Sequence, residues 1–196
     1  CCYIYTSGTT GNPKGVMITH DNLIFEGKIM NSLLSKYNNK KEQRIISYLP
    51  LSHIAGMLID IICPIVGASE GENINVNFAR ADDLKKGTLI ERMKLIKPTL
   101  FFGVPRVWEK MKEKIELTLS ESNSTKKKIF NWSRNNSSGR NPLSFVSKNI
   151  LNNLKIKLGL DKCQIFASGA APLSDEIYEF YKSINIDILE SYGMSE

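Results

Sequence analysis

Residues 2–15 read CYIYTSGTTGNPKG, and this stretch decides what kind of fold the rest of the chain supports. A short apolar run, 1–5, is typical of a buried strand, and it leads into a ten-residue loop at 6–15. The loop holds three glycines, three threonines, a serine, a proline and one lysine. Glycines let successive backbone N–H groups close around an anion, while the hydroxyls and Lys14 add donors and positive charge. The pattern indicates a loop that binds a polyphosphate.

The loop does not match a Walker A motif, in which a lysine is followed directly by serine or threonine at the start of a helix. Here Gly15 follows Lys14, and Pro13 precedes it. Proline has no N–H to offer to a phosphate. We therefore expect a different grip on a triphosphate, with a purely structural glycine turn as the alternative.

The bulk composition is that of one domain with a sizeable core. The chain has 196 residues, 42% of them apolar, and a net charge of +6. The basic excess gathers at 36–44 and 126–140, which is typical of a solvated surface. Nucleic-acid binding is an alternative that rests on charge alone, so we expect no nucleic-acid partner. Four cysteines, at positions 1, 2, 63 and 163, fit neither zinc-binding nor C-x-x-C spacing and indicate reduced cytosolic thiols.

The two ends of the chain and one long apolar run indicate whether it is part of a longer protein and whether it crosses a membrane. The chain starts at Cys1 and its last residues read SYGMSE, so we expect an internal piece of a longer protein. Residues 45–68 are long enough to span a membrane, but Pro50, Asp60 and Pro64 interrupt them. We expect a strand and a buried helix there, no transmembrane helix, and a cytoplasmic protein. Peripheral attachment to the cytosolic face of the endoplasmic reticulum or another membrane stays open, as does the oligomeric state.

Strand and helix patterns alternate along the chain. Apolar or alternating runs predict further strands at 44–50 and 73–79, and strands that run into a turn or loop within 98–105, 162–172 and 185–196. Helical spacing predicts helices at 19–37, 53–66, 82–97, 106–122, 143–158 and 173–184, with a polar link at 120–141 inside an Asn- and Lys-rich helical excursion at about 120–153. This alternation predicts an α/β fold of layered, mostly parallel sheets flanked by helices. Ligands of such folds bind beyond the carboxyl ends of strands, which singles out the loops 6–15, 168–172 and 191–196.

The motif YTSGTTGNPKGVMITHDNL, residues 5–23, resembles the phosphate-loop signature of the AMP-forming acyl-CoA synthetase (adenylate-forming) superfamily. Two further stretches follow in the family's order. SGAAPL at 168–173 resembles its small-residue adenine loop, and SYGMSE at 191–196 resembles its Tyr-Gly-x-Thr-Glu motif. YLPLSHIAGM at 48–57 and FFGVPRVWEKMKEKI at 101–115 are similar to long-chain and bubblegum-type fatty acyl-CoA synthetases. Three ordered motifs across nearly the whole chain make the resemblance specific.

The resemblance implies roles for residues of all three motifs. The β- and γ-phosphates of ATP would be held by Thr6, Ser7, Gly8, Thr9, Thr10, Gly11 and Lys14, with Lys14 acting catalytically as pyrophosphate leaves. The rest of the nucleotide would be held by Gly169, Ala170, Ala171, Ser191, Tyr192, Gly193, Met194 and Ser195, with Tyr192 on the adenine ring and Ser195 on the α-phosphate. Glu196, a catalytic acid of the family, would hold Mg²⁺ together with Thr6.

The resemblance also implies a catalytic His53 beside the α-phosphate, and an acyl pocket between residues 54–66 and 100–103. His53, Met57, Phe102 and Gly103 are the expected pocket residues. A capping histidine and ordinary core packing are the alternatives. Met57 stands where many relatives carry an aromatic gate residue, so we do not expect a gating mechanism. Ser195 stands where threonine is commoner, and it keeps the hydroxyl group.

The expected function is ATP-dependent activation of a long-chain fatty acid, through an acyl-adenylate, to acyl-CoA, with release of AMP and pyrophosphate. The expected cofactors are ATP, Mg²⁺ and CoA, and the expected partners are a fatty acid and CoA. Residues 1–196 would be part of one adenylating domain, without the small C-terminal domain and its catalytic lysine, so we expect no turnover by this chain alone. The alternatives are a fatty acyl-AMP ligase or another carboxylate-adenylating ligase, and a non-catalytic nucleotide- or lipid-binding relative.

Overall fold

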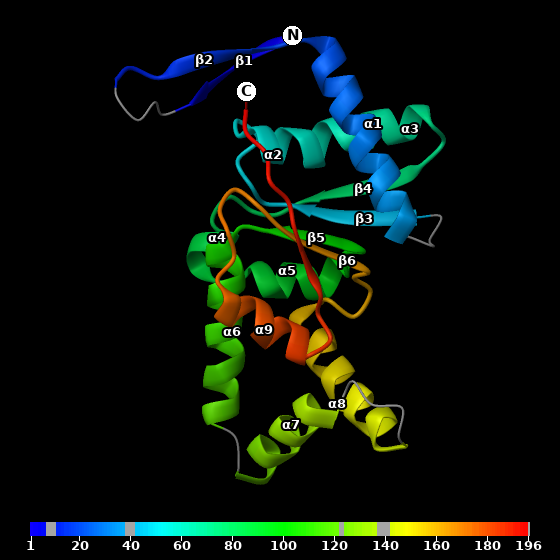
Figure 1. Cartoon of the computed structure of the whole chain (residues 1–196), viewed down its shortest axis with the longest axis vertical. Helices are drawn as coiled ribbons and strands as arrows, with labels where there is room; N and C mark the ends of the chain where they lie inside the picture. Colours follow the sequence, from blue (N-terminus) through cyan, green and yellow to red (C-terminus); the bar gives the residue numbers. More distant parts are fainter. Residues whose placement is uncertain (7–10, 38–41, 122–123, 137–141, 196) are drawn as a thin grey trace.

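The computed structural model describes residues 1–6, 11–37, 42–121, 124–136 and 142–195. A five-stranded parallel sheet forms its centre, with the strand order β4-β3-β5-β6-β7 (Figure 1). The strands are β3 Glu42–Ser47, β4 Asn73–Phe78, β5 Leu100–Gly103, β6 Ile165–Ser168 and β7 Ile188–Glu190. Each neighbouring pair is parallel. The predicted α/β fold with a mostly parallel sheet flanked by helices is therefore confirmed.

One face of the sheet is covered by α1 and by three consecutive helical segments. They are α1 His20–Tyr37, α2 Ile54–Met57, the π-helix η1 Leu58–Ile62 and α3 Cys63–Ser69. The helices α1 and α3 cross closely at Gly27, where a Cβ would lie 3.0 Å from the Val66 side chain. Beneath them the sheet presents a small aliphatic cluster of Ile45, Leu100 and Ile165.

The opposite face is covered by a second set of helices and holds the main core. They are α5 Leu89–Ile96, α6 Pro105–Ser120, α8 Pro142–Leu158 and α9 Asp175–Ser183. Trp108 packs edge-on against Phe101 and Tyr181, at ring distances of 5.1 and 4.9 Å. The Trp108 Nε1–H donates to the Gly103 carbonyl at 3.1 Å, and the Tyr181 hydroxyl donates to the Trp108 carbonyl at 2.8 Å. These bonds satisfy the polar atoms of two large buried rings.

The apolar run at 45–68 folds into a strand and helical segments, as predicted, although most of the helical residues are half-buried rather than buried. The helix becomes a π-helix before Pro64, which lacks the N–H that a regular turn would donate. The Cys63 N–H donates to the Leu58 carbonyl, five residues earlier, which is the π-helical spacing. Among the residues that the structure describes, no helix is both long and apolar enough to cross a membrane.

The N-terminal stretch folds differently from the prediction. It forms an antiparallel hairpin of β1 Cys2–Thr6 and β2 Lys14–Ile18, outside the main sheet. The strand predicted at 1–5 is present as β1, but its predicted burial is wrong, because only every second side chain faces inward: Ile4 is buried, whereas Tyr3 and Tyr5 are 65% and 70% exposed. The strand β2 was not predicted, since Pro13 and Gly15 read as loop residues. The inner face of the hairpin packs against Leu23 at the start of α1.

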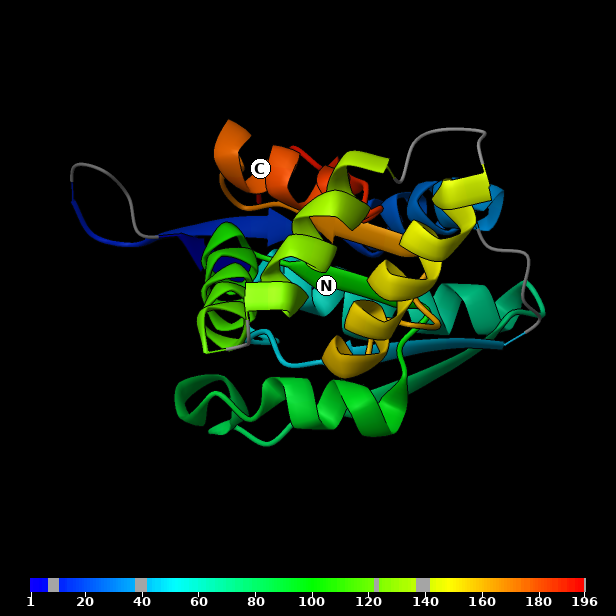
Figure 2. The same cartoon turned by 90° about the horizontal axis from the view of Figure 1, so that it is seen from below.

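Two further segments also differ. The predicted helix at 82–97 is divided into α4 Asp83–Lys86 and α5, because Gly87 adopts a left-handed φ of 70° that ends the first piece. The predicted polar link at 120–141 contains a helix, α7 Ser124–Asn136. Figure 2 looks onto α7 and α8 from below. Phe130 of α7 is buried in the main core, and this contact holds the otherwise polar helix against the domain.

Candidate functional site

Four loops gather at one edge of the sheet because all its strands are parallel. They follow β3, β5, β6 and β7, and they carry His53, Val104, the segment 168–172 and the segment 191–195. The last two loops were predicted as site loops from the sequence. The first predicted loop instead joins the two antiparallel strands of the hairpin.

The loops after β6 and β7 are tied together by hydrogen bonds. The Ser191 backbone N–H donates to the Ser168 carbonyl at 2.8 Å, and the Ser191 hydroxyl donates to the same carbonyl at 3.1 Å. The Glu190 carboxylate accepts from the Leu173 N–H at 2.7 Å, which closes the end of the 168–172 loop. These two sequence-predicted motifs therefore form one continuous wall.

The backbone of this wall is built for close approach. A Cβ at Gly169 would lie 2.6 Å from the Ser191 hydroxyl and 2.8 Å from the Phe102 ring, so a larger residue would push these side chains aside. Ala170 has a φ of 72°, a left-handed conformation that costs a non-glycine residue roughly 1–2 kcal/mol. Such strain is found where the surrounding structure holds a loop in a functional shape. The hydroxyl of Ser168, at the foot of the loop, is buried without a hydrogen-bond partner in the described part of the chain.

The segment after β7 offers its side chains to the outside. Tyr192 is 91% exposed, and its ring is open on the surface for stacking. A Cβ at Gly193 would meet nothing within 4 Å. Met194 is exposed and Ser195 is half-buried. Glu196, the predicted metal ligand and catalytic acid, lies outside the described residues.

The described residues of the glycine loop, Thr6 and 11–15, lie at the end of the hairpin. Thr6 ends β1 and stands opposite Lys14, which begins β2. Ser7, Gly8, Thr9 and Thr10 lie outside the described residues, and Gly11 is exposed. Lys14 is exposed, and it forms no ion pair with any residue that the structure describes. Its charge is thus available to an anion. No hydrogen bond or ion pair of the described residues joins Lys14 to the wall made by the other two loops.

His53 caps the N-terminus of α2. Its Nδ1 accepts from the Ala55 N–H at 3.2 Å, so in the neutral ring the proton sits on Nε2. The ring is exposed, and Nε2 makes no hydrogen bond within the described residues. The capping alternative therefore accounts for one ring nitrogen, and the other remains available to a ligand at the sheet edge.

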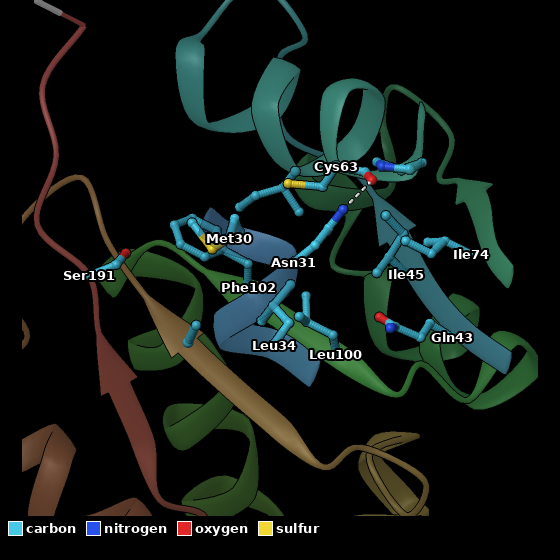
Figure 3. A pocket seen from close by; sticks show the side chains of 13 residues that line it. Met30, Asn31, Leu34, Gln43, Ile45, Cys63, Ile74, Leu100, Phe102 and Ser191 are labelled. Atoms are coloured by element: carbon cyan, nitrogen blue, oxygen red, sulfur yellow. Dashed lines mark hydrogen bonds between the residues drawn. The ribbon is translucent and has the colours of Figure 1, made fainter. Parts of the chain in front are cut away.

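A cavity lies between α1, η1, α3 and the sheet (Figure 3). Its volume is about 60 Å³, room for a few water molecules at roughly 10–15 Å³ each, so a long acyl chain enters only if side chains move. Figure 3 shows Ser191 at one end and Gln43 and Ile74 toward the other. The lining is almost entirely apolar and comes from Met30, Asn31, Leu34, Gln43, Ile45, Ile59, Cys63, Pro64, Ile74, Leu100, Phe102, Ala167 and Ser191.

The predicted pocket residues are divided by the structure. Phe102 lines the cavity, whereas His53, Met57 and Gly103 do not. Met57 packs instead against the hairpin cluster that holds Ile4, and Gly103 lies against Trp108 on the other face. The α1 residues of the lining were not predicted, because nothing in their helical spacing tells which element they will face.

Two ionisable groups lie beside this cavity. Burial raises the pKa of the Asp60 carboxyl to about 6, and a hydrogen bond with Ser47 opposes the rise. Burial raises the pKa of the Cys63 thiol to about 12, with a further rise from the nearby charge of Asp60. The Cys63 thiol is therefore protonated and acts as a small apolar group at neutral pH. Among the described residues, no group of three or more His, Cys, Asp or Glu side chains could hold a metal ion.

Comparison with known proteins agrees with this arrangement. A family model described as AMP-binding enzyme matches residues 1–196. The chain is 44% identical over 98% of its length to the long-chain-fatty-acid–CoA ligase ACSBG2 of Homo sapiens and covers 30% of that protein. It is 40% identical over its whole length to the ACSBG2 of Gallus gallus and covers 27% of it.

Solved structures show the same architecture. The A-PCP didomain of carboxylic acid reductase from Segniliparus rugosus, in complex with AMP, matches with a TM-score of 0.67 and 26% identity, covering 99% of this chain and 24% of that one. The fatty acyl-adenylate ligase from L. pneumophila, in complex with acyl adenylate and pyrophosphate, matches with a TM-score of 0.58 and 20% identity, over 99% and 28% of the two chains, and shows the fold alone.

The chain spans less than a third of the length of each of the two curated relatives. Within that span the family model is matched from the first residue to the last. The predicted membership is confirmed: the chain belongs to the AMP-binding enzyme family.

Proposed function

We propose that the protein activates a long-chain fatty acid with ATP, through an acyl-adenylate, to acyl-CoA, and releases AMP and pyrophosphate. One observation carries the proposal: Ser191 belongs to both halves of the site. Its N–H and hydroxyl bond to the Ser168 carbonyl in the small-residue loop, and it also lines one end of the apolar cavity. An acid whose tail enters the cavity would thus hold its carboxylate next to the nucleotide loops.

The chemistry requires like charges to be brought together, because a carboxylate must attack the α-phosphorus of a polyanion. We propose that the hydroxyls and N–H groups of 6–11, together with Lys14, hold the β- and γ-phosphates. Lys14 has an exposed, unpaired charge among the described residues, which suits this role. Oriented donors of this kind stabilise charge that develops as pyrophosphate leaves. His53, with its free Nε2 at the sheet edge, would contact the α-phosphate or the carboxylate.

The other half of the nucleotide would lie on the wall formed by the second and third loops. Gly169 is buried and lets the loop after β6 lie close against Ser191 and Phe102, while the exposed Tyr192 beside it can stack on a flat ring. Ser195 would donate to the α-phosphate. Of the two proposed Mg²⁺ ligands only Thr6 is described, and a single hydroxyl does not make a site, so the fit of the metal rests on Glu196. When bound, Mg²⁺ would supply positive charge to the phosphates.

The relatives support the acid and the second substrate. The curated proteins at 40% and 44% identity are named long-chain-fatty-acid–CoA ligases, and the AMP-bound neighbour supports use of an adenine nucleotide. We propose that the CoA thiol attacks the acyl-adenylate and displaces AMP. We further propose that residues 1–196 form part of one adenylating domain of the complete protein, which would need the rest of that domain for turnover.

The test is ATP–pyrophosphate exchange by the complete protein with a panel of acids, followed by thioester formation with CoA. We expect exchange with hexadecanoate, little with benzoate or amino acids, and thioester when CoA is added. Exchange without thioester would make the protein a fatty acyl-AMP ligase. Exchange only with aryl or amino acids would contradict the proposed substrate. Nucleotide binding without any exchange would point to a non-catalytic relative.

A further inference from the structure

Asp60 is a buried carboxyl that the proposed chemistry does not use. It lies in the π-helix η1 and is 6% exposed. Its polar neighbours are Ser47, which hydrogen-bonds to it, and Tyr48, on whose hydroxyl its charge acts. No ion pair joins Asp60 to any lysine, arginine or histidine that the structure describes. A buried carboxylate without a cation is costly, and π-helices are frequent at functional positions.

The carboxyl lies next to the acyl cavity. Asp60 lines a second, smaller cavity of about 10 Å³, which is enough for one water molecule. The two cavities share four wall residues, Ile45, Ile59, Leu100 and Phe102. These side chains border both the space beside Asp60 and the space proposed for the acyl tail, and Figure 3 shows Leu100 and Phe102 in the wall of the larger cavity.

The negative charge of Asp60 reaches into the larger cavity. It raises the pKa of the Cys63 thiol, and Cys63 lines that cavity. Glu26 of α1 adds to the same effect on Cys63, and from the sheet side Tyr48 is the ionisable group that faces Asp60. Two carboxyl groups of the same helix layer therefore act on this region, Glu26 on α1 and Asp60 on η1, together with the Tyr48 phenol and the Cys63 thiol. The cavity is thus apolar in its lining, and the buried Asp60 carboxyl is the acidic group nearest to it on η1.

We propose that Asp60 is a specificity-determining residue that reserves the cavity for acids with an uncharged tail, by repelling a second carboxylate or another terminal anion. The inference rests on the proposed function, because it takes the cavity as the acyl site. A terminal methyl group meets only aliphatic walls there. A terminal carboxylate would be desolvated near a like charge, and both terms oppose its binding. The same repulsion keeps a fatty acid from entering with its carboxylate first.

The test compares methyl-ended acids with α,ω-dicarboxylic acids of eight to sixteen carbons, by kcat/KM for pyrophosphate release in the complete protein. We expect the wild-type preference for the methyl-ended acid to peak at the length that brings the far carboxylate beside Asp60. In Asp60→Asn that preference should fall about tenfold, the repulsion of unit charges roughly 10 Å apart at an effective dielectric of about 20. Asp83→Asn is the matched control, since Asp83 is equally buried but paired with Arg92, and it should leave the ratio unchanged.

A second measurement needs no substitution. A long-chain acid with a terminal sulfonate keeps its charge at every pH used, so its kcat/KM relative to the methyl-ended acid reports the charge of the site. We expect this ratio to rise in the wild-type protein as the pH falls from 7.5 to 5.5, and to stay flat in Asp60→Asn. A ratio that is flat in both proteins, or a preference unchanged in Asp60→Asn, would overturn the inference while hexadecanoate is still activated. Failure of the wild-type protein to activate hexadecanoate would overturn the proposed function, and the inference with it.

Discussion

The two faces of the sheet differ in how they are filled. On the α6 and α9 face, Phe101, Trp108 and Tyr181 are fully buried and pack ring against ring. On the α1 and α3 face, aliphatic side chains surround a cavity, and the buried polar groups Asn31 and Asp60 lie beside it. Strand β5 shows the contrast in two successive residues, because Phe101 points into the packed core and Phe102 into the cavity wall. One face provides stability, and the other leaves room for a ligand.

The largest expected effect comes from truncating those two neighbours in the complete protein. Phe101→Ala should lower the free energy of unfolding by about 3–5 kcal/mol, because it leaves a cavity in a close-packed core. Phe102→Ala should cost about 1–2 kcal/mol, since its half-buried ring already borders empty space. Urea unfolding followed by tryptophan fluorescence measures both. Equal losses for the two variants would contradict the difference between the faces.

Phe102→Ala also sharpens the comparison through activity. Removal of the ring enlarges the cavity and joins it to the smaller one, so bulkier or branched acids should gain in kcat/KM relative to hexadecanoate. A panel of straight and branched acids in the pyrophosphate-release assay measures this. An unchanged order of preference in a folded Phe102→Ala protein would count against the cavity as the acyl site.

The pH dependence of stability should differ between the wild-type protein and Asp60→Asn. The pKa of Asp60 is raised in the folded state from 3.8 to about 6, so the folded protein holds this proton more tightly than the unfolded chain. Its contribution is fully present below about pH 4 and is lost as the pH rises through 6. Relative to the wild type, Asp60→Asn should therefore gain about 2 kcal/mol between pH 4 and pH 7, allowing for partial screening. A constant difference across that range would show that Asp60 titrates normally.

The sheet and most helices could be predicted from the sequence, whereas the cavity could not. Continuous apolar runs such as those around Ile45 and Phe101 predict buried parallel strands, and prolines mark their ends. The hairpin was missed because Pro13 and Gly15 are loop signals, while pairing with β1 outweighs local preference in β2. The lining residues Met30 and Leu34 read as an ordinary apolar helix face. Which element that face meets, and how much space is left between them, depends on tertiary packing that a single sequence does not specify.

The candidate site was predicted unevenly for the same reason. Ser191 was expected to contact the nucleotide, and its position at the cavity end follows only from the pairing of β6 with β7. Met57 was expected in the pocket, and it packs against the hairpin instead. Asp60 was regarded as an interruption of an apolar run. A π-helix turns it toward the sheet, and that irregularity has no sequence signal beyond Pro64.

The smallest expected effect is on stability, in the loop 168–172 that follows β6. Ala170→Gly should stabilise the protein by about 0.5 kcal/mol, because relief of the left-handed φ slightly exceeds the added entropy of the unfolded chain. Ala171→Gly is the matched control and should destabilise by about 0.5–1 kcal/mol, since the neighbouring residue has no such strain to relieve. Thermal melting of the two variants measures the opposite signs. A clear loss of stability in Ala170→Gly would contradict the strained loop.

Photolabelling of the complete protein tests most directly that one face of the sheet receives the acid. A hexadecanoate analogue with a diazirine in its tail would be bound in the presence of ATP and irradiated, and the labelled peptides identified by mass spectrometry. We expect labels on the cavity-lining residues Met30, Leu34 and Phe102, reduced by an excess of hexadecanoate. Competed labels on α6 or α9, with none on α1 or β5, would contradict the assignment of the acyl site to this cavity.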